Sequence, residues 1–381
     1  MQNHAPQATE VFDDLIAALT EIKEQYLLNT ERFDTPLDVI EGFRYVGQAL
    51  SGASEMFFEA DPKRPRFVSI VDPGRKFQGD NPDAIYHFAR IRGDRSYLLS
   101  GTIGQECYTS FTIHGAADDG GMAGPLLGDV NDKDFEVGED GYYELILSAD
   151  EPREGGNWIK LEPEAHAVIV RSYFALEPSV QNDPNVAVKI AIEALPGKNG
   201  ELPPSPPPLN DGTFAARMAE GVAFLRQVTV GQNMPGSASG VPFVSDIPND
   251  VATPFSFRDS GMPVPGAADI FYSMGRWDFA EDEALVMTGE IPEGPFANVM
   301  LWNQHMQTVD YRNRRSSLNQ NQIAFEPDGS YRIVIAHSDP GQPNWLDVEG
   351  HTRGTIFWRF LLPETDPVKP HIERVKLADL S

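Results

Sequence analysis

One segment in the second half of the chain, LWNQHMQTVDYRNRRSSLNQNQ at residues 301–322, concentrates side chains that can do chemistry. It brings together imidazole, carboxyl, phenol, amide and guanidinium groups, most of which are rarely spared for a hydrophobic core. The residues concerned are Trp302, Asn303, His305, Gln307, Asp310, Tyr311, Arg312, Arg314, Arg315, Asn319 and Asn321. This composition predicts a functional site in the segment.

Within the segment, His305, Asp310 and Tyr311 form the candidate catalytic group. Histidine titrates near neutral pH, and a neighbouring carboxylate would orient the imidazole and raise its pKa. We therefore expect His305 and Asp310 to transfer protons, with Tyr311 beside them. The alternative is that His305 only satisfies a local hydrogen bond.

The same segment supplies candidate binding groups. Arg312, Arg314 and Arg315 fall within four positions of a chain whose formal net charge is −27. Guanidinium groups suit planar anions such as carboxylate, sulfate or phosphate. Together with Trp302 as an aromatic platform and Asn303, they predict a surface for a small organic or sugar-derived, anionic ligand. The alternative is a structural network in which the arginines hold neighbouring Asp and Glu side chains.

A second candidate lies in the acidic, glycine-rich loop at residues 114–140. His114, Asp118 and Asp119 could bind a hard cation or act as acid and base. A solvated acidic loop without a site is the alternative, and the twelve-residue calcium-loop pattern is absent from the sequence. We expect no bound metal. His337 and His351 would suit a metal only if they met across a sheet.

The elements that position these residues occur twice. Residues 139–178 and 327–364 align with an offset of 187 to 188 residues, and the match extends upstream. The matched features are Asp140-Gly141 with Asp328-Gly329, Asn157-Trp158 with Asn344-Trp345, and Arg171 with Arg359. Two copies of about a hundred residues indicate a duplicated domain. We assign the shared features to the scaffold and expect the site where the copies differ.

Short β-branched or aromatic segments, separated by Gly, Pro, Asn or Asp, are typical of strands. Each copy is therefore predicted to be an antiparallel β-sandwich or jelly roll, in a mainly β protein with helical additions. Helices are expected at 9–28, after the capping residue Thr35, and at 213–230; the first two should form an N-terminal hairpin. The predicted divisions are a helical region at 1–60, a first repeat at 61–180, a linker with helix and loop at 181–268, and a second repeat at 269–381.

Composition restricts the partners. A chain with 57 acidic and 30 basic residues repels nucleic acid and anionic lipid, so we expect neither as a partner. Cys107 is the single cysteine, which excludes an internal disulfide. The N-terminus lacks the pattern of a secretory signal, and no apolar run is long enough to span a bilayer. These features predict a cytoplasmic protein.

Parts of the chain carry a family resemblance. WNQHMQTVDYRNRRSSLNQNQ, the Asn344-Trp345 pair with Arg359, and VDPGRKFQGDNPDAIYHFARIRGDRSYLLSG in the first half resemble bacterial proteins of the DUF1214 family. The resemblance covers most of residues 35–365 and implies a β-sandwich fold. The family has no assigned function, so the resemblance offers no catalytic residues.

Two functions remain open. The first is a cofactor-independent acid–base enzyme, a hydrolase or lyase and in one version a glycosidase, with its site on the second repeat. The second is a non-catalytic protein that binds a small molecule or carbohydrate, or that forms a homo-oligomer. The sequence contains no G-x-S-x-G, P-loop, G-x-G-x-x-G or H-E-x-x-H motif. If residues 302–315 form the site, His305→Ala and Arg314→Ala should remove ligand binding without changing the melting temperature.

Overall fold

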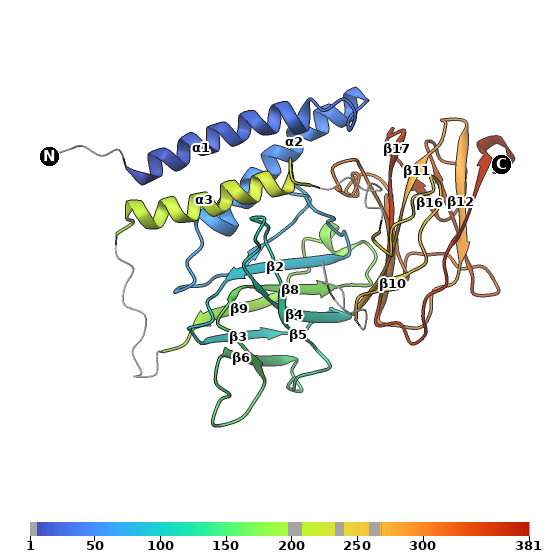
Figure 1. Ribbon diagram of the computed structural model, residues 1–381. Helices are drawn as coiled ribbons and strands as arrows, with labels where there is room; N and C mark the ends of the chain where they lie inside the picture. Colours follow the sequence, from blue (N-terminus) through green and yellow to red (C-terminus); the bar gives the residue numbers. More distant parts are fainter. Residues whose placement is uncertain (1–5, 197–207, 233–239, 259–266, 268, 381) are drawn as a thin grey trace.

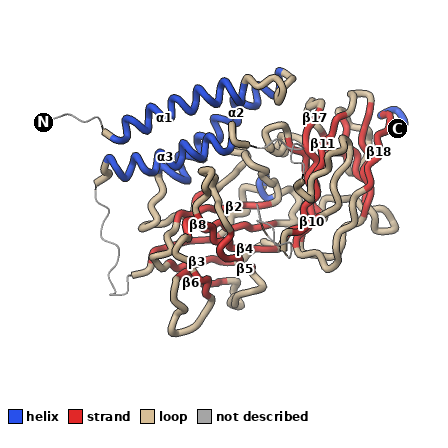
Figure 2. The backbone as a smooth tube through the Cα atoms, in the orientation of Figure 1, coloured by secondary structure: helices blue, strands red, loops and turns tan. Residues whose placement is uncertain are grey.

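The computed structural model describes residues 6–196, 208–232, 240–258, 267 and 269–380 (Figure 1). Helices gather on one side of the molecule, and two groups of strands make up the rest (Figure 2). The helices lie against the first group of strands, and the second group stands beside both.

The helical layer is built from segments far apart in the sequence. Its helices are α1 (Gln7–Glu21) with the π-helix η1 (Ile22–Leu27), α2 (Pro36–Ala53) with the π-helix η2 (Ser54–Phe58), and α3 (Asp211–Val228). Thr35 and Asp38 form the capping box that starts α2, which confirms the predicted cap. Helix α1 begins without a side-chain cap, and Phe12 and Ile16 of its apolar stripe are half exposed.

The first repeat is a sandwich of two sheets. The order in the five-stranded sheet is β1 (Val68–Ser69), β2 (Ala84–Arg90), β8 (Ala165–Tyr173), β4 (Tyr108–Gly115) and β5 (Leu126–Asn131). The order in the four-stranded sheet is β7 (Trp158–Lys160), β6 (Tyr142–Ser148), β3 (Tyr97–Thr102) and β9 (Lys189–Ala194). Side chains such as Leu99, Phe111, Leu145 and Val170 fill the core between the sheets.

The second repeat has the same strand order, which confirms the duplication. Its five-stranded sheet runs β10 (Phe255–Ser256), β11 (Ile270–Asp278), β17 (Arg353–Leu361), β13 (Phe296–Trp302) and β14 (Ser317–Asn319). Its four-stranded sheet runs β16 (Trp345–Asp347), β15 (Tyr331–Ala336), β12 (Glu283–Gly289) and β18 (His371–Lys376). The short 3₁₀ helices η3 (Val180–Asn182) and η4 (Leu377–Leu380) complete the elements of the described chain.

The Asn-Trp pairs have the same structural role in both copies. The Nδ2 atom of Asn157 donates to the carbonyl oxygens of Glu136 and Glu144 at 2.8 and 2.9 Å. Asn344 repeats this with two carbonyl oxygens at 2.8 and 3.0 Å. Each of these asparagines therefore ties a loop to the neighbouring strand, as expected of scaffold residues.

The strands extend beyond the predicted divisions. Strand β9 closes the first repeat after residue 180, and β10 joins the second repeat before residue 269. The described part of the long loop, residues 240–258, runs along β11, with Val244 bridged to Met274 and Val251 in the core of the second sandwich. The proline-rich connector at 197–207 and residues 233–239, 259–266 and 268 of the loop lie outside the described residues.

Candidate active site between the two repeats

The structure places His305 inside the molecule, between the helical layer and the second repeat. Its side chain is fully buried, with Nδ1 2.8 Å from the Tyr26 hydroxyl and Nε2 2.7 Å from the Asp38 carbonyl oxygen. Because a carbonyl only accepts, Nε2 donates and Nδ1 accepts from Tyr26. Burial lowers the pKa of His305 to about 4, so the ring is neutral at pH 7.

The three candidate catalytic residues do not form one group. The Asp310 carboxylate accepts from Asn313 Nδ2 at 2.7 Å and from the Arg312 backbone N–H at 3.1 Å. Tyr311 is buried, with the Lys76 ammonium 5.2 Å from its ring centroid. The expected orientation of His305 by Asp310, with a raised pKa, is therefore corrected: both ring nitrogens have other partners and the pKa is lowered.

The candidate binding residues are also engaged in structural contacts. Trp302 is buried, stacks on Phe357 at 4.2 Å and donates from Nε1 to the Asp80 carbonyl oxygen at 3.3 Å. Asn303 Nδ2 donates to the Glu41 carboxylate at 2.8 Å. Neither residue offers the exposed platform that the sequence predicts.

The three arginines of the segment lie at the surface and do not converge. Arg314 pairs with Asp347 at 2.8 Å, and Arg315 donates to the Pro343 carbonyl oxygen at 2.5 Å. Arg312 is exposed. The geometry of Arg314 matches the structural network that was the alternative interpretation of these residues.

The candidates from the acidic loop lie apart as well. His114 is buried in β4, where its nitrogens contact Gly124 O at 3.1 Å and Thr112 Oγ1 at 3.0 Å, and Asp119 caps Gly121. No hydrogen bond, ion pair or ring contact between described residues joins this loop to residues 302–315. The two candidate segments of the sequence therefore do not form a common site through any of these contacts.

Both copies carry an arginine at the equivalent position of the five-stranded sheet, where a site could form. Arg171 stands in β8 between Tyr86 of β2 and Ser110 of β4, in register. Arg359 stands in β17 between Tyr272 of β11 and Asn298 of β13. Asn131 and Asn319 end the two rows. Each five-stranded sheet therefore carries the same transverse row, Tyr–Arg–Ser/Asn–Asn.

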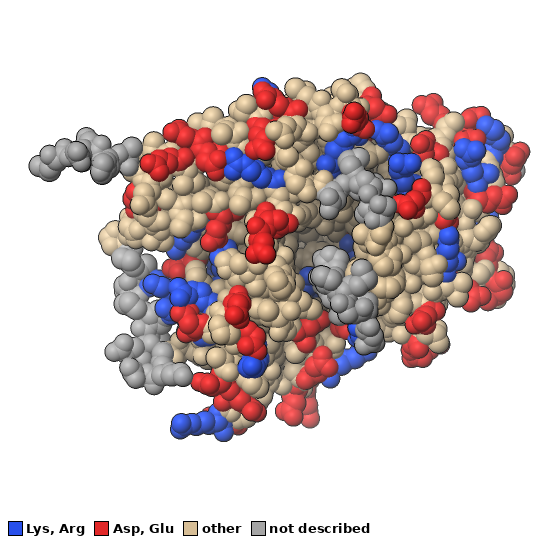
Figure 3. All heavy atoms as spheres, viewed as in Figure 1, with Lys and Arg blue, Asp and Glu red and all other residues tan. Residues whose placement is uncertain are grey.

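The two rows point away from their sandwich cores and towards each other. Their strand neighbours Val170 and Trp358 fill the cores, so the rows occupy the opposite faces. Burial raises the pKa of the Tyr272 hydroxyl, whereas the charges of both Arg359 and Arg171 pull that pKa down. Tyr272 is therefore within electrostatic range of both guanidinium groups. Figure 3 shows the surface hollowed between the two repeats, with basic side chains in and around the hollow.

Neither guanidinium has an ion-pair partner within the described ranges. Arg171 donates from Nη1 to Thr112 Oγ1 at 2.6 Å. Arg359 donates to Met300 Sδ at 3.0 Å and to the Gly79 carbonyl oxygen at 2.9 Å. In a chain of net charge −27, two partly or fully buried arginines without a carboxylate contact are suited to bind an anion.

An acidic side chain stands beside Arg171. Asp129 of β5 lies in register with Thr112, the residue that Arg171 contacts. Its Oδ1 atom is buried without a hydrogen-bond partner. Burial raises the pKa of Asp129 to about 6, with a contribution from the charge of Asp269 and an opposing one from Arg171. Such a carboxyl group can exchange a proton near neutral pH.

The second carboxyl group of the site, Asp269, is engaged. Its Oδ2 atom accepts from the Tyr108 hydroxyl at 2.6 Å and from Asn131 Nδ2 at 3.1 Å, and its Oδ1 atom contacts Arg258. Asp269 is therefore held by three donors, whereas Asp129 keeps one carboxylate oxygen without a hydrogen-bond partner.

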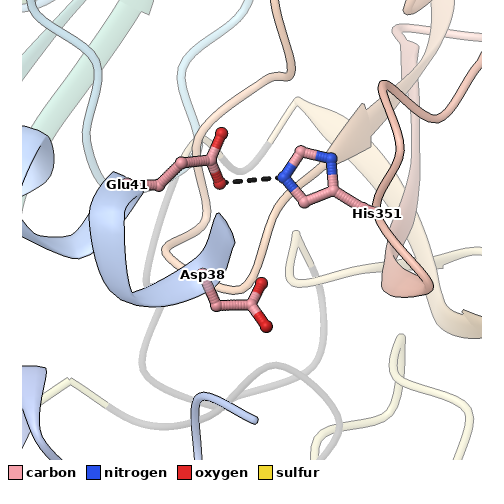
Figure 4. Close-up of side chains that lie close together, drawn as sticks. All are labelled: Asp38, Glu41 and His351. Carbon is pink, nitrogen blue, oxygen red and sulfur yellow. Dashed lines mark hydrogen bonds and ion pairs between the residues drawn. The ribbon is translucent and has the colours of Figure 1, made fainter. Parts of the chain in front are cut away.

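A separate cluster, Asp38, Glu41 and His351, places one ligand atom of each residue within 4.8 Å of the others (Figure 4). His351 contacts two acceptors, Glu41 at 2.8 Å and the Val348 carbonyl oxygen at 2.8 Å, which requires protons on both nitrogens. Burial opposes this charge, but Glu41 raises the pKa of His351. The Asp38 carboxylate instead caps α2 through Thr35. These contacts define an ion pair that docks α2 on the second repeat, and they fit a metal ion poorly.

The fold and the facing sheets define a protein of two tandem β-sandwiches with a helical layer. The sequence matches the family described as "Protein of unknown function (DUF1214)" at residues 88–177 and again at 280–365. A crystal structure of an uncharacterised protein from Burkholderia cenocepacia is 32% identical over 98% of this chain and 99% of that chain, with a TM-score of 0.83. The chain belongs to the DUF1214 family.

A more distant structure shares the fold. The VPA0106 protein from Vibrio parahaemolyticus is 13% identical over 88% of this chain and 98% of that chain, with a TM-score of 0.54. No curated protein matches the sequence. Among the described residues, none of the helices has the length and apolar character needed to cross a membrane.

Proposed function

We propose that the protein is an acid–base enzyme, a hydrolase or lyase, that acts on a small organic anion between its two five-stranded sheets. The observation that carries this proposal is the juxtaposition of Arg171 with the buried, unbonded oxygen of Asp129 across Thr112. A guanidinium group binds a carboxylate, and a carboxyl group with a pKa near 6 can take up or release a proton.

The roles follow from the positions. Arg171 of the first repeat and Arg359 of the second would hold the anionic group, and the hydroxyls of Tyr86 and Tyr272 lie in the same rows. Asp129 would move the proton. Proton transfer by these side chains requires no cofactor.

Paired-carboxylate chemistry of the glycosidase kind fits less well, because Asp269 is held by three donors. The same commitment of Asp269 favours the second candidate, a protein that binds the anion without transforming it. Substitution of Asp129 distinguishes the enzyme from the binding protein, because only the enzyme needs the proton of this carboxyl group.

The test compares Arg171→Gln with Arg314→Gln in calorimetric titrations with acetate, succinate, benzoate and glucuronate. Loss of a guanidinium–carboxylate contact should weaken binding by about tenfold or more in Arg171→Gln. The matched control Arg314→Gln, an exposed arginine of the 302–315 segment, should bind as the wild type does. The reverse result would contradict the proposed site.

Catalysis is tested by comparing Asp129→Asn with the wild type on any acid that the wild type converts, with the conversion monitored by NMR. Loss of the proton-transfer group should lower turnover by about 10²- to 10⁴-fold while binding persists. If the wild type binds acids and leaves all of them unchanged, the protein is a binding protein.

A further inference from the structure

The wall of the site on the second repeat is aromatic. Tyr272 and Phe357 have ring centroids 5.7 Å apart, and Phe357 stacks on Trp302. Phe243, from the segment that runs along β11, lies 5.5 Å from Tyr272 and 5.8 Å from Phe257. These rings belong to one apolar cluster on the outer face of the five-stranded sheet.

The first repeat presents rings to the same cluster. Tyr86 and Tyr173 meet edge to face at 6.1 Å, with their hydroxyls 3.3 Å apart. Tyr173 also lies 5.1 Å from Phe296 of the second repeat, so rings from both repeats are in contact. Tyr86 and Phe243 are only partly buried, so part of each ring is accessible.

Charge and aromatic surface are adjacent in this wall. The guanidinium carbon of Arg359 lies 4.5 Å from the ring centroid of Phe357 and 5.5 Å from that of Trp302. Phe357 and Trp302 are buried, so a ligand with its anionic group at the arginines would meet the partly buried rings of Tyr86 and Phe243. Flat, apolar atoms gain most from such a surface.

The amide N–H groups of the two rows already have partners, and in these rows only Ser110 Oγ and Asn298 Oδ1 are buried without one. Asn298 Nδ2 donates to Asn81 Oδ1 at 2.8 Å and to Asp83 Oδ2 at 2.9 Å. Asn319 Nδ2 donates to Asp83 Oδ1 at 2.9 Å, and Asn131 Nδ2 donates to Asp269. These two atoms are too few for the hydroxyls of a polyhydroxylated ligand, and each hydroxyl left unpaired weakens binding.

We infer that the ligand of this site is an aromatic or similarly flat, unsaturated carboxylic acid, with its carboxylate at the arginines and its flat body between Phe243, Tyr272 and Tyr86. The inference rests on the proposed function, because it names the class of anion that the same site accepts. It excludes sugar acids as the preferred ligands.

The test compares three acids of equal charge, benzoate, cyclohexanecarboxylate and glucuronate, by calorimetric titration of the full-length protein. Benzoate should bind at least about tenfold more tightly than glucuronate and a few-fold more tightly than cyclohexanecarboxylate, since ring contacts add to apolar burial. Phe243→Leu should reduce the preference for benzoate over cyclohexanecarboxylate. Phe271→Leu is the matched control. Phe271 precedes Tyr272 in β11 but packs against the sandwich core, so this variant should keep the preference for benzoate.

The outcomes separate this inference from the proposed function. If glucuronate binds as tightly as benzoate and Arg171→Gln weakens both, the anion site stands and the aromatic class is wrong. If Phe243→Leu and Phe271→Leu change the preference equally, the aromatic wall does not contact the ligand. If none of the acids binds, or Arg171→Gln leaves binding unchanged, the proposed function itself fails.

Discussion

In the proposed function, Arg171 and Arg359 have a binding role in addition to the scaffold role that their repetition predicts. Each interrupts an apolar strand, in IVRSYF and in FWRFLL, and burial of a guanidinium group is costly without a partner. Because the two arginines occur in both copies, the sequence predicts that they belong to the scaffold, like the Asn-Trp pairs. The asparagines and the arginines differ in what their side chains contact. The asparagines donate to nearby backbone carbonyls, whereas the arginines lie on the outer face of the sheet.

The ionisation of Asp129 should make the stability of the protein depend on pH. The unfolded chain ionises this carboxyl near its ordinary pKa of 3.8, whereas burial moves the folded value to about 6. The folded state therefore holds the proton more tightly, and this group's contribution to stability falls as pH rises from about 4 to 6. Asp129→Asn removes that loss and should stabilise the protein at pH 7.5 by on the order of 1 to 3 kcal/mol.

Chemical denaturation at pH 7.5 and pH 4 measures this effect. The gain should be present at pH 7.5 and much smaller at pH 4, where the folded state is protonated and the unfolded chain is only about half ionised. A variant that is destabilised equally at both values would show that Asp129 makes a stabilising contact instead. For an enzyme that uses Asp129 as a base, activity should also rise as pH passes about 6.

Among the elements, the polar segment at residues 301–322 has the clearest structural role. It joins the second repeat to the helices and to the first repeat. Gln307 Nε2 donates to Gln48 Oε1 at 2.7 Å, and the Thr308 backbone N–H donates to Asp80 Oδ1 at 2.7 Å. The sequence shows that the segment is unusual, but the partners of Gln307 and Thr308 lie more than 200 residues away.

The helices were predictable where local signals specify them. Thr35, Pro36 and Asp38 define the start of α2 from neighbouring positions alone. The helical layer itself was not predictable, because α3 joins α1 across the chain through contacts such as Arg226 with Asp14. Local capping chemistry is encoded within a few residues, whereas the packing of distant helices depends on the whole fold.

His305→Ala tests the structural role of the segment at residues 301–322. The substitution leaves a cavity among Tyr26, Phe33 and Tyr45 and removes two buried hydrogen bonds. The free energy of unfolding should fall by about 2 to 4 kcal/mol. Arg314→Ala, at the exposed end of the same segment, should change it by less than about 1 kcal/mol. Thermal and urea denaturation of both variants provide the measurement.

A ligand-binding role for His305 would give a different pattern. His305→Ala would then keep the wild-type stability and lose binding, as expected if residues 302–315 form the site. Equal stability of the two variants would contradict the structural role of His305.

At the scale of the whole molecule, internal duplication determines both the architecture and the candidate site. The repeat in the sequence was sufficient to predict two β-sandwiches. It could not show that the two five-stranded sheets face each other, because that orientation depends on buried contacts such as Asp83 with Asn298 and Asn319. In the proposed function, the equivalent rows of the two copies would together form one composite site.

The most direct test of this account is a crystal structure of the protein in complex with the organic acid that binds most tightly in the titrations. We predict electron density for its carboxylate between Arg171 and Arg359, with Asp129 beside it. Density instead at the surface formed by Arg312, Arg314 and Arg315, with the space between the repeats unoccupied, would contradict the central claim.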